Sequence, residues 1–343
     1  MLKEKVMEKI QLGGSDLKVS RLTIGCWSFG GGEGSYWGAQ NQADVDALVG
    51  AALDRGINFF DTAIGYNNGQ SEASLGKALK GRRKEAIICN KMFIQDKELV
   101  KSYENTLRES LKRLDTDYVD IMMIHWPEKN VELFRENMEA LISARKKGLV
   151  REIGVSNFGT GSLKMAHEMG VNVVINESGY NLMCRGIEKE ILPYCIDKKI
   201  GILTYQPLMQ GVLTGKYPKV ADIPLSRRRT VHYAKMDNPD NLHGGPGANA
   251  EVESLLDGLK SLSAKTGHKS GALAIAWVNH KPGVTSIIVG CRNVEQLDEN
   301  MKSFEIKLSS DVIKEMDDIS KPLFDKVGDF LDIYRGTNDP RVW

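Results

Sequence analysis

The sequence has no apolar run long enough to cross a membrane and no cysteine pattern typical of a metal or disulfide site. A transmembrane helix needs about 20 predominantly apolar residues, and no such run occurs. The five cysteines are scattered and none forms a C-x-x-C pair, which indicates free thiols rather than disulfides or zinc. Residues 1–5 lack the apolar core of a signal peptide. We therefore expect a cytoplasmic protein with no bound metal.

The sequence also lacks an excess of charge of either sign. Lys and Arg number 46 and Asp and Glu 45, a formal net charge of +1, which argues against electrostatic capture of nucleic acid or a membrane. No low-complexity tract or solenoid-type repeat occurs. A chain of 343 residues is compatible with one α/β barrel domain. We expect a single domain over 1–343 with a small-molecule partner; a homo-oligomer stays open.

The chain alternates strand-like apolar runs with segments of helical periodicity, a pattern typical of consecutive βα units. We expect strands at residues 22–26, 57–60, 86–90, 118–124, 151–155, 171–175, 201–204 and 285–289. We expect helices at residues 43–55, 71–79, 97–114, 131–147, 161–169, 187–198, 252–264, 271–279, 294–301 and 310–319. Eight strands in this order predict an α/β fold, a single (β/α)8 TIM barrel with long βα loops.

Three segments fall outside this alternation. Residues 7–20 alternate loosely around a Gly-Gly-Ser-Asp turn and predict an N-terminal β-hairpin, which could plug the end of the barrel opposite the active face. Residues 217–249 are rich in proline and glycine and predict a long lid-like loop. Its arginines 227–229 either reach phosphate groups or form a solvated charge run. Residues 322–343 are expected to be a C-terminal tail that either caps the active face or mediates assembly.

Polar side chains with catalytic chemistry come at the ends of consecutive predicted strands. Asp61, Lys91 and His125 each end such a run, and Tyr66 follows Asp61 in a loop rich in glycine and asparagine. A parallel barrel gathers the carboxyl ends of its strands on one face, so we expect these four side chains to form one catalytic constellation. Taken singly, each has a plain alternative as a cap, turn or surface residue. Their joint position at strand ends favours a site.

The loop after the first predicted strand is rich in glycine and aromatic residues. Glycine permits unusual backbone angles, and large apolar surfaces suited to a substrate pocket are supplied by Trp27, Phe29, Tyr36 and Trp37. The alternative is a loop whose aromatic side chains only cover the core. Trp126, after the fourth predicted strand, is a further candidate wall of the pocket.

Six motifs in a consistent order resemble the aldo-keto reductase superfamily, in its bacterial type, over nearly the whole chain. They are Phe60-Asp61-Thr62-Ala63-x-x-Tyr66 with Gly69-x-Ser71-Glu72-x-x-Leu75-Gly76; Asn90-Lys91; Ile124-His125-Trp126-Pro127; Gly154-Val155-Ser156-Asn157-Phe158; Tyr205-x-Pro207-Leu208 with Gly211-x-Leu213-x-Gly215-Lys216-Tyr217; and Ile287-Ile288-Val289-Gly290 with Arg292, Gln296 and Asn300. Each motif is weak alone, and six in this order at strand ends make a strong signal.

The resemblance implies reversible hydride transfer between a nicotinamide dinucleotide and a carbonyl compound or alcohol. The cofactor supplies the hydride, and the protein positions it and handles a proton. Tyr66 would be the general acid for the carbonyl oxygen, or the base in the reverse direction. The Lys91 ammonium, held by Asp61, would lower the pKa of Tyr66 from its usual value of about 10. His125 would hydrogen-bond the substrate oxygen.

The resemblance also implies a cofactor site. Ser156 and Asn157 would bind the nicotinamide carboxamide, and Tyr205 would stack on the ring. Arg292 suits a 2′-phosphate, which favours NADP(H) over the alternative NAD(H); the plain alternative for Arg292 is a solvated surface charge. Further positions expected to contact the cofactor are Glu177, Gln206, Pro207, Leu208, Gly211, Leu213, Gly215, Lys216, Gly290, Gln296 and Asn300.

Two residues depart from the family pattern. Glu177 stands where the family usually has a glutamine that pairs with the carboxamide, and a carboxylate cannot donate to the carboxamide oxygen. A negative charge there favours the cationic oxidised nicotinamide. We therefore expect Glu177 to bias the enzyme toward alcohol oxidation or toward a cycle that reuses bound cofactor. Gln206, where many relatives have serine, leaves the pyrophosphate side less defined.

The favoured function is an NADP(H)-dependent oxidoreductase acting on a sugar-like or other small polar carbonyl or alcohol, because the loops around Tyr66 are polar and rich in glycine. Two alternatives remain. The first is a binding protein that senses the cofactor, as ion-channel β subunits resembling this family do. The second is a redox-neutral conversion in which hydride is removed and returned while the cofactor stays bound.

Overall fold

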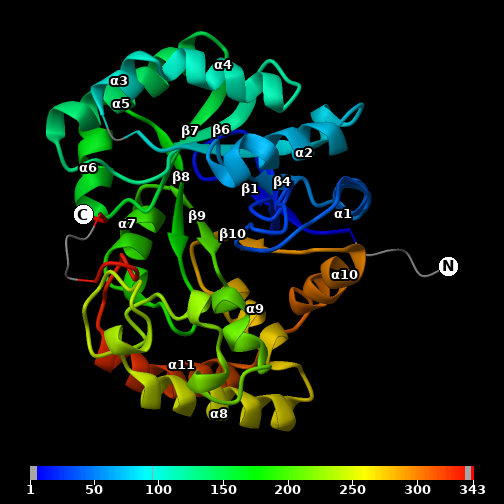
Figure 1. Ribbon diagram of the computed structural model, residues 1–343, viewed down its shortest axis with the longest axis vertical. Coiled ribbons are helices and arrows are strands. Elements are labelled where there is room, and N and C mark those ends of the chain that lie inside the picture. The colour runs from blue at the N-terminus through cyan, green and yellow to red at the C-terminus, as the bar shows by residue number, and fades with distance from the viewer. Residues whose placement is uncertain (1–5, 95, 337–340) are drawn as a thin grey trace.

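The computed structural model describes residues 6–94, 96–336 and 341–343. Within them, eight parallel strands close into a barrel in the order β10-β3-β4-β5-β6-β7-β8-β9 (Figure 1). The strands are β3 (Leu22–Gly25), β4 (Phe59–Asp61), β5 (Ile87–Met92), β6 (Val119–Ile124), β7 (Val150–Ser156), β8 (Val173–Gly179), β9 (Gly201–Tyr205) and β10 (Val284–Val289). The predicted (β/α)8 barrel is confirmed, and so is the order of its strands.

Helices alternate with the strands and cover the outside of the barrel (Figure 1). They are α1 (Gln42–Asp54), α2 (Gln70–Ala78), α3 (Lys97–Lys101), α4 (Tyr103–Arg113), α5 (Val131–Lys146), α6 (Thr160–Glu168), α7 (Ile191–Asp197), α8 (Asn249–Thr266), α9 (Ser270–His280), α10 (Val294–Ser303) and α11 (Ser310–Val327). None of the helices in the described ranges combines the length and apolar character needed to span a bilayer.

Two expected helices are interrupted. The helix predicted over 97–114 divides at Ser102, whose hydroxyl donates to the Leu99 carbonyl at 3.2 Å and whose ψ of 2° leaves the helical range. Serine side chains compete with the backbone in this way. The helix predicted over 187–198 begins as a 3-10 turn, η3 (Gly186–Glu188), and becomes α-helical only at Ile191.

The C-terminal helix is longer than predicted. It was expected to end at residue 319, because Pro322 lacks a backbone N–H and disfavours a helix interior. The structure continues α11 through Pro322 to Val327, and Leu323 in this last part is fully buried. Packing of α11 against the core, including α8, therefore outweighs the local cost of the proline. The expected tail begins at residue 328 instead of 322, and its residues 337–340 lie outside the described part of the chain.

The N-terminal hairpin closes one end of the barrel. Its strands β1 (Lys9–Gln11) and β2 (Lys18–Ser20) pair antiparallel. Leu12, Leu17 and Val19 are buried against inward-facing residues of the barrel strands, including Phe59 and Ile121. The hairpin is thus the plug that the sequence suggested.

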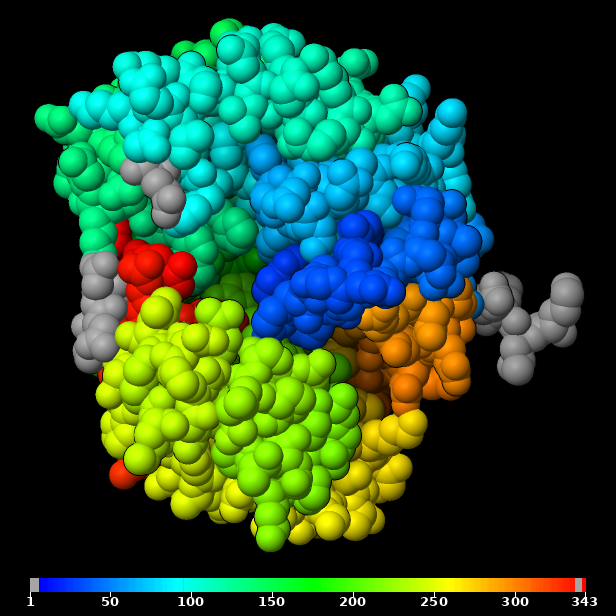
Figure 2. Space-filling view, viewed as in Figure 1, coloured from blue at the N-terminus to red at the C-terminus, as the bar shows by residue number. Residues whose placement is uncertain are grey.

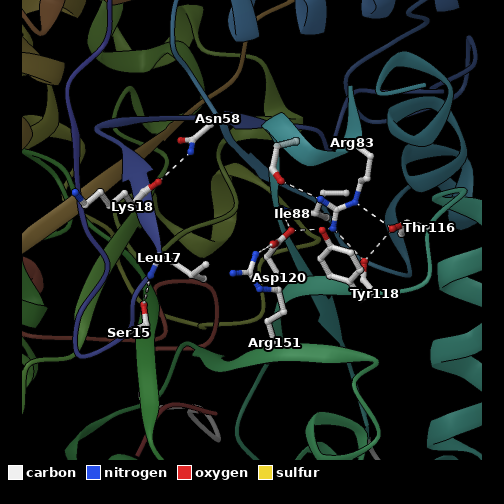
Figure 3. A network of polar contacts seen from close by, with 11 residues as sticks. Ser15, Leu17, Lys18, Asn58, Arg83, Ile88, Thr116, Tyr118, Asp120 and Arg151 are labelled. Atoms are coloured by element: carbon white, nitrogen blue, oxygen red, sulfur yellow. Dashed lines mark hydrogen bonds and ion pairs between the residues drawn. The ribbon is translucent and has the colours of Figure 1, made fainter. Parts of the chain in front are cut away.

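A buried ion network ties three strands together near this same end. Asp120 on β6 is 1% exposed and accepts from Arg83 at 2.8 Å, from Arg151 on β7 at 2.7 Å and from the Ile88 amide on β5 at 3.0 Å. Figure 3 shows the carboxylate between the two guanidinium groups. The Arg83 guanidinium also lies 4.5 Å from the centre of the Tyr118 ring. This network lies away from the strand ends that carry the candidate catalytic residues.

The segment 217–249 holds no long helix or strand in its described residues, as predicted, but it is packed rather than loose. It contains the short turns η5 (Val220–Asp222), η6 (Leu225–Arg227) and η7 (Lys235–Asp237). Thr230, His232 and Tyr233 in this segment are fully buried. His232 bonds the Met183 carbonyl at 2.8 Å, which ties the segment to the loop after β8.

Candidate active site

Strand periodicity places three charged side chains together above the apolar floor of the barrel. Successive side chains of a strand point to opposite faces. Phe59, Cys89 and Ile175 point inward and belong to the interior cluster; two residues further along the same strands stand Asp61, Lys91 and Glu177. In the strand register, Asp61 pairs with Cys89, two residues before Lys91, and Glu177 pairs with Leu203; the ion pairs of Lys91 bring the three charged groups together. Lys91 and Glu177 lie one and two residues beyond the expected strand ends of 90 and 175, because β5 continues to Met92 and β8 to Gly179.

Lys91 is the cation at the centre of this level. Its Nζ forms ion pairs with Asp61 and, at 3.2 Å, with Glu177 Oε2. The side chains of Lys91, Asp61 and Glu177 are 0%, 5% and 5% exposed. Burial opposes the charge on Lys91, but the neighbouring carboxylates outweigh burial and raise the pKa of Lys91 well above its usual value. Lys91 therefore stays an ammonium ion.

The two carboxyl groups share this single cation. Burial raises the pKa of Asp61 although Lys91 opposes the change. Burial and the neighbouring Asp61 raise the pKa of Glu177 to about 8, again against Lys91. The Glu177–Lys91 contact is an ion pair without good hydrogen-bond geometry, because the buried Oε2 accepts no hydrogen bond from the described residues. Sequence reasoning placed Glu177 beside the nicotinamide; the structure also makes it a partner of Lys91.

Tyr66 lies at the start of η1 (Tyr66–Gly69), over this buried level. Lys91 Nζ is 5.3 Å from the centre of its ring, and the His125 ring lies edge-on at 6.0 Å. The expected lowering of its pKa is outweighed: burial raises the pKa of Tyr66, Lys91 lowers it, and the carboxylates Asp61 and Glu177 raise it further. Tyr66 is therefore a neutral phenol and can donate a proton.

His125 directly follows β6 and is half-buried. Burial, Lys91 and Arg341 lower its pKa to about 3. Its ring is therefore neutral at ordinary pH, and one of its nitrogens can donate a hydrogen bond without adding charge. The structure thus brings together the four residues that the sequence predicted as one constellation.

A supporting residue that sequence reasoning did not assign is Glu72, part of the first motif. Its fully buried carboxylate accepts from Asn90 at 2.8 Å, from Ser110 at 2.5 Å and from Arg113 at 2.6 Å. Asn90 immediately precedes Lys91 in β5. Glu72 therefore fixes the end of the strand that carries the lysine to α2 and α4.

The residues expected around a nicotinamide ring also lie together. The Tyr205 hydroxyl donates to Asn157 Oδ1 at 2.7 Å, and Asn157 Nδ2 donates to the Ser156 hydroxyl at 3.0 Å and to the His125 carbonyl at 3.1 Å. A Cβ at Gly179 would lie 3.1 Å from the Tyr205 ring. The absence of a side chain at Gly179 thus lets Tyr205 lie against β8.

The expected pyrophosphate loop follows β9. It includes Pro207 and Leu208 and the 3-10 turn η4 (Met209–Thr214), in which Leu213 is fully buried and anchors the loop. Gly211 and Gly215 have φ of 89° and 83°, a conformation that favours glycine. Lys216 is exposed, with its ammonium 4.8 Å from the centre of the Tyr217 ring. The backbone of this glycine-containing turn and the Lys216 ammonium group are thus accessible to an anion.

Gln206 is hydrogen-bonded to the C-terminal segment. Its Nε2 donates to the Tyr334 hydroxyl at 2.7 Å. Gln210 donates to the same hydroxyl at 3.3 Å. The departure at Gln206 therefore attaches the C-terminal segment to the end of β9.

The expected adenosine end lies after β10. A Cβ at Gly290 would meet no described atom within 4 Å. Arg292 donates through its guanidinium to the carbonyls of Trp37 and Ala39, so it holds the aromatic loop after β3. Gln296 accepts from the Arg292 amide at 2.9 Å, and Asn300 donates to Cys291 Sγ at 3.3 Å. The glycines, the Tyr205 ring and this basic, open end fit a dinucleotide.

The aromatic loop forms a wall beside Tyr66. Trp27 is 37% exposed and stacks on Tyr66 and on Tyr36, with ring centres 5.6 and 5.2 Å away. Trp37 lies edge-on to Trp27 at 5.6 Å. These contacts favour a pocket wall over a simple cover of the core for these three aromatic residues, whereas Phe29 is fully buried.

The C-terminal segment supplies the opposite border. Arg341 lies 3.4 Å above the centre of the Trp126 ring and pairs with buried Asp332 at 2.7 Å. Trp343 lies 5.6 Å from Phe134, ring centre to ring centre. The face in Figure 2 shows a hollow between the C-terminal segment (red), the loop after β3 (blue) and the yellow-green segment after β9. The capping alternative for the tail is therefore favoured.

Arg227, the first of the three arginines, lies at this mouth. Its NH1 donates to the Gln210 carbonyl at 2.8 Å, and its guanidinium is 5.7 Å from the centre of the Trp37 ring. Tyr36 donates to the Gln210 side chain at 2.6 Å. Side-chain contacts thus hold the loops after β3 and β9 together. No group of His, Cys, Asp and Glu in the described ranges is arranged to hold a metal ion.

Comparisons with known proteins agree with this arrangement. Residues 21–321 match the profile described as the Aldo/keto reductase family. The chain is 32% identical over 340 residues to a protein of Oryza sativa subsp. japonica described as a probable voltage-gated potassium channel subunit beta, covering 92% of this chain and 98% of that protein. It is 30% identical over 325 residues to the NADH-specific methylglyoxal reductase of Escherichia coli (strain K12), covering 88% and 95%.

A solved structure is also similar along the barrel. The thermostable aldo-keto reductase Tm1743, in complex with the inhibitor epalrestat, superposes with a TM-score of 0.71 at 27% identity. The match covers 91% of this chain and 100% of that chain. The similarity therefore includes the strand ends that carry the candidate site.

Proposed function

Because the chain belongs to the aldo/keto reductase family, we propose that it is an NADP(H)-dependent oxidoreductase of small polar, sugar-like carbonyl compounds and the corresponding alcohols. Family membership makes it an NAD(P)-dependent oxidoreductase; the substrate class and the preference for NADP(H) are the proposal. The observation that carries it is the meeting of Asp61, Tyr66, Lys91 and His125 at one end of the barrel.

The bound nicotinamide supplies or accepts the hydride, and the protein handles the proton. Tyr66 is the proton donor to the carbonyl oxygen, and the Lys91 ammonium beside it stabilises the phenolate left behind. Asp61 keeps Lys91 in place and charged. Neutral His125 donates a hydrogen bond to the same oxygen.

The cofactor is held along the loops after β7, β9 and β10. Ser156 and Asn157 would bind the carboxamide, Tyr205 would cover the ring, and the 211–216 turn would receive the pyrophosphate. The exposed Arg292 guanidinium donates to the Trp37 and Ala39 carbonyls and places a positive charge at the adenosine end, which supports the preference for NADP(H). The E. coli relative is described as NADH-specific, so the alternative, NAD(H), belongs in the test.

The substrate pocket lies between the aromatic loop and the C-terminal segment. Trp27, Trp37 and Trp126 offer flat apolar faces, and the amides of Asn67 and Gln210 lie in the loops around it. Flat faces with polar rims suit hydroxylated substrates such as aldoses and polyols. We infer that residues 1–343 work as one barrel domain, with the 217–249 segment and the described residues after 327 (328–336 and 341–343) as borders of this pocket.

The first test is cofactor titration by fluorescence, followed by turnover of aldoses, polyols and aromatic aldehydes measured by NADPH absorbance. Tyr66→Phe should lower kcat by about 100-fold or more, because general acid catalysis contributes about that much, and should leave cofactor affinity nearly unchanged. Tyr194→Phe, a partly buried tyrosine on α7, is the matched control and should keep full activity. Turnover that survives in Tyr66→Phe would remove Tyr66 from the proposed role.

A second candidate is a cofactor-binding subunit without turnover. It is supported by the likeness to a protein described as a probable channel β subunit along nearly its full length. The same titration separates the two: tight NADPH binding with no turnover of any carbonyl in the panel would favour this candidate. Product formed without net change in NADPH would instead favour the redox-neutral cycle.

A further inference from the structure

Asp61, Lys91 and Glu177 make a buried group with two acids and one base. All three side chains are at most 5% exposed. If both acids were ionised, the group would carry a net negative charge in a place where water cannot screen it, and such a charge is costly. One proton held by the acid pair makes the group neutral.

Glu177 is the less firmly held of the two acids. Asp61 is hydrogen-bonded to the ammonium, whereas Glu177 Oε2 lies 3.2 Å from it and accepts no hydrogen bond from the described residues. Burial and Asp61 raise the pKa of Glu177 to about 8. Because this oxygen is buried and accepts no hydrogen bond, a new positive charge nearby would favour ionisation of Glu177.

Glu177 also lies among the residues proposed to hold the nicotinamide. It pairs in register with Ser156, and its carbonyl accepts from the Asn157 amide at 2.7 Å. On the other side, Gly179 of the same strand receives the Tyr205 ring. A nicotinamide ring covered by Tyr205, with its carboxamide at Asn157, would therefore be a near neighbour of the Glu177 carboxyl group.

We propose that Asp61 and Glu177 share one proton beside Lys91, and that this proton is released when the cationic, oxidised nicotinamide binds but is kept when the neutral, reduced form binds. The protein then favours oxidised cofactor increasingly as pH rises. This inference rests on the proposed function. Glu177 acts here as a positioning residue that sets the charge around the cofactor and around Tyr66.

Asp61 on β4, the other member of the acid pair, faces Glu177. The remaining groups that face it are Cys89 and Lys91 on β5, Tyr205 on β9 and Tyr66 in η1, and none of these four has its pKa near neutral pH. Burial raises the pKa of Cys89, Tyr205 and Tyr66, and that of Lys91 is also raised. A proton exchanged between about pH 6 and pH 8 therefore comes from the acid pair.

The experiment measures dissociation constants for NADP+ and NADPH between pH 6 and pH 9 by fluorescence and calorimetry. For the wild-type protein, the ratio Kd(NADPH)/Kd(NADP+) should rise by up to about tenfold per pH unit, as expected for one linked proton, and level off above pH 8 or so. Titration of the 2′-phosphate affects both forms and cancels in the ratio. A tenfold change corresponds to about 30 mV in the potential of the bound couple relative to the free one.

The matched variants are Glu177→Gln and Glu168→Gln, the second at an exposed position on α6. Glu177→Gln should give a ratio that does not change with pH and stays near the wild-type value at pH 6, whereas Glu168→Gln should follow the wild type. A wild-type ratio independent of pH, or an unchanged slope in Glu177→Gln, would overturn the inference. Failure of both NADP+ and NADPH to bind would instead count against the proposed function.

A second readout does not depend on any variant. Calorimetry of NADP+ binding to the wild-type protein near pH 7, in two buffers with different ionisation enthalpies, reports the number of protons released. Up to one proton should be released with NADP+ and fewer with NADPH. Equal proton release for the two forms would overturn the shared-proton inference even if Glu177→Gln fails to fold.

Discussion

At the scale of single residues, His125 shows how charge is arranged around the reacting atoms. It lies beside Lys91 and close to Arg341, both positive, and burial adds to their effect on its pKa. A ring kept neutral in this way can donate to an oxygen that becomes negative without competing with Lys91 for the role of cation. The C-terminal arginine therefore contributes to the state of a histidine more than 200 positions earlier in the chain.

Arg341→Gln should raise the pKa of His125, because it removes one of the nearby positive charges. The folded value of about 3 lies below the usual 6.5, so the neutral ring stabilises the fold above pH 6.5 and this stability is lost as pH falls toward 3. In the variant this acid-induced loss should still begin near pH 6.5 but end at a higher pH and reach a smaller total, with a slope of at most about 1.4 kcal/mol per pH unit for one proton. NMR titration of the ring C–H signals, assigned with His125→Asn, measures the change.

Arg229→Gln removes the same charge at an exposed position and is the control. If both variants leave the His125 titration where it is in the wild type, Arg341 has no electrostatic effect on the site.

Residue-scale properties of the site were only partly predictable from sequence. Spacing at strand ends placed Asp61, Tyr66, Lys91 and His125 together, because the barrel fixes where strand ends meet. The spacing of residues in the sequence could not predict the pKa of Tyr66, because that pKa depends on the balance between burial and three neighbouring charges. The contact between Glu177 and Lys91 was missed for a similar reason: β8 continues to Gly179 instead of ending at 175, and spacing does not report which side chain then contacts the lysine.

At the scale of elements, the end of β5 is held from outside the barrel. The carboxylate of Glu72 on α2 accepts hydrogen bonds from Asn90 on β5 and from Ser110 and Arg113 on α4. The carboxylate thus joins one strand and two helices through hydrogen bonds, two of them from neutral donors and one from a cation. Loss of this joint should loosen the strand end that presents Lys91.

Glu72→Gln should destabilise the protein by about 2 kcal/mol, because an amide replaces a buried acceptor of three donors and leaves Arg113 without its carboxylate. Because Arg113 is partly exposed, we expect less than the cost of about 3–5 kcal/mol for breaking a fully buried pair. Urea unfolding measures the loss, and kcat should fall while cofactor affinity changes little. Glu109→Gln, whose exposed carboxylate pairs with Lys112 on the same helix α4, should change stability by less than about 0.5 kcal/mol.

The identity and order of the elements followed from sequence periodicity, but several boundaries did not. Alternating runs gave every strand of the barrel, since a buried parallel strand is a short apolar run. Boundaries failed where a single side chain or a tertiary contact decides: the Ser102 hydroxyl divides the helix expected at 97–114, and the packing of Leu323 carries α11 past Pro322. Periodicity reports the face of an element and does not report such contacts.

At the scale of the whole molecule, the barrel separates stability from chemistry along its axis. One end is closed by the hairpin and by the Asp120 network, and the other carries the ionisable residues and the loops that border the hollow. The two ends are separated by the layer of apolar side chains that includes Phe59, Cys89 and Leu203. Substitutions at the closed end should therefore change folding and leave the site nearly intact.

Leu12→Ala tests this separation. Leu12 is fully buried and packs into the floor of the barrel with Leu17 and Val19. Truncating it should cost about 2–5 kcal/mol of folding free energy, because the lost contacts leave a cavity, while the dissociation constant for NADPH and the kcat of the folded protein stay within about twofold of wild type. Val6→Ala, at a side chain that is 67% exposed, is the control and should be nearly neutral. A loss of cofactor affinity in Leu12→Ala that matches its loss of stability would mean that the apolar layer transmits changes from the floor to Lys91, and that the barrel does not isolate its two ends.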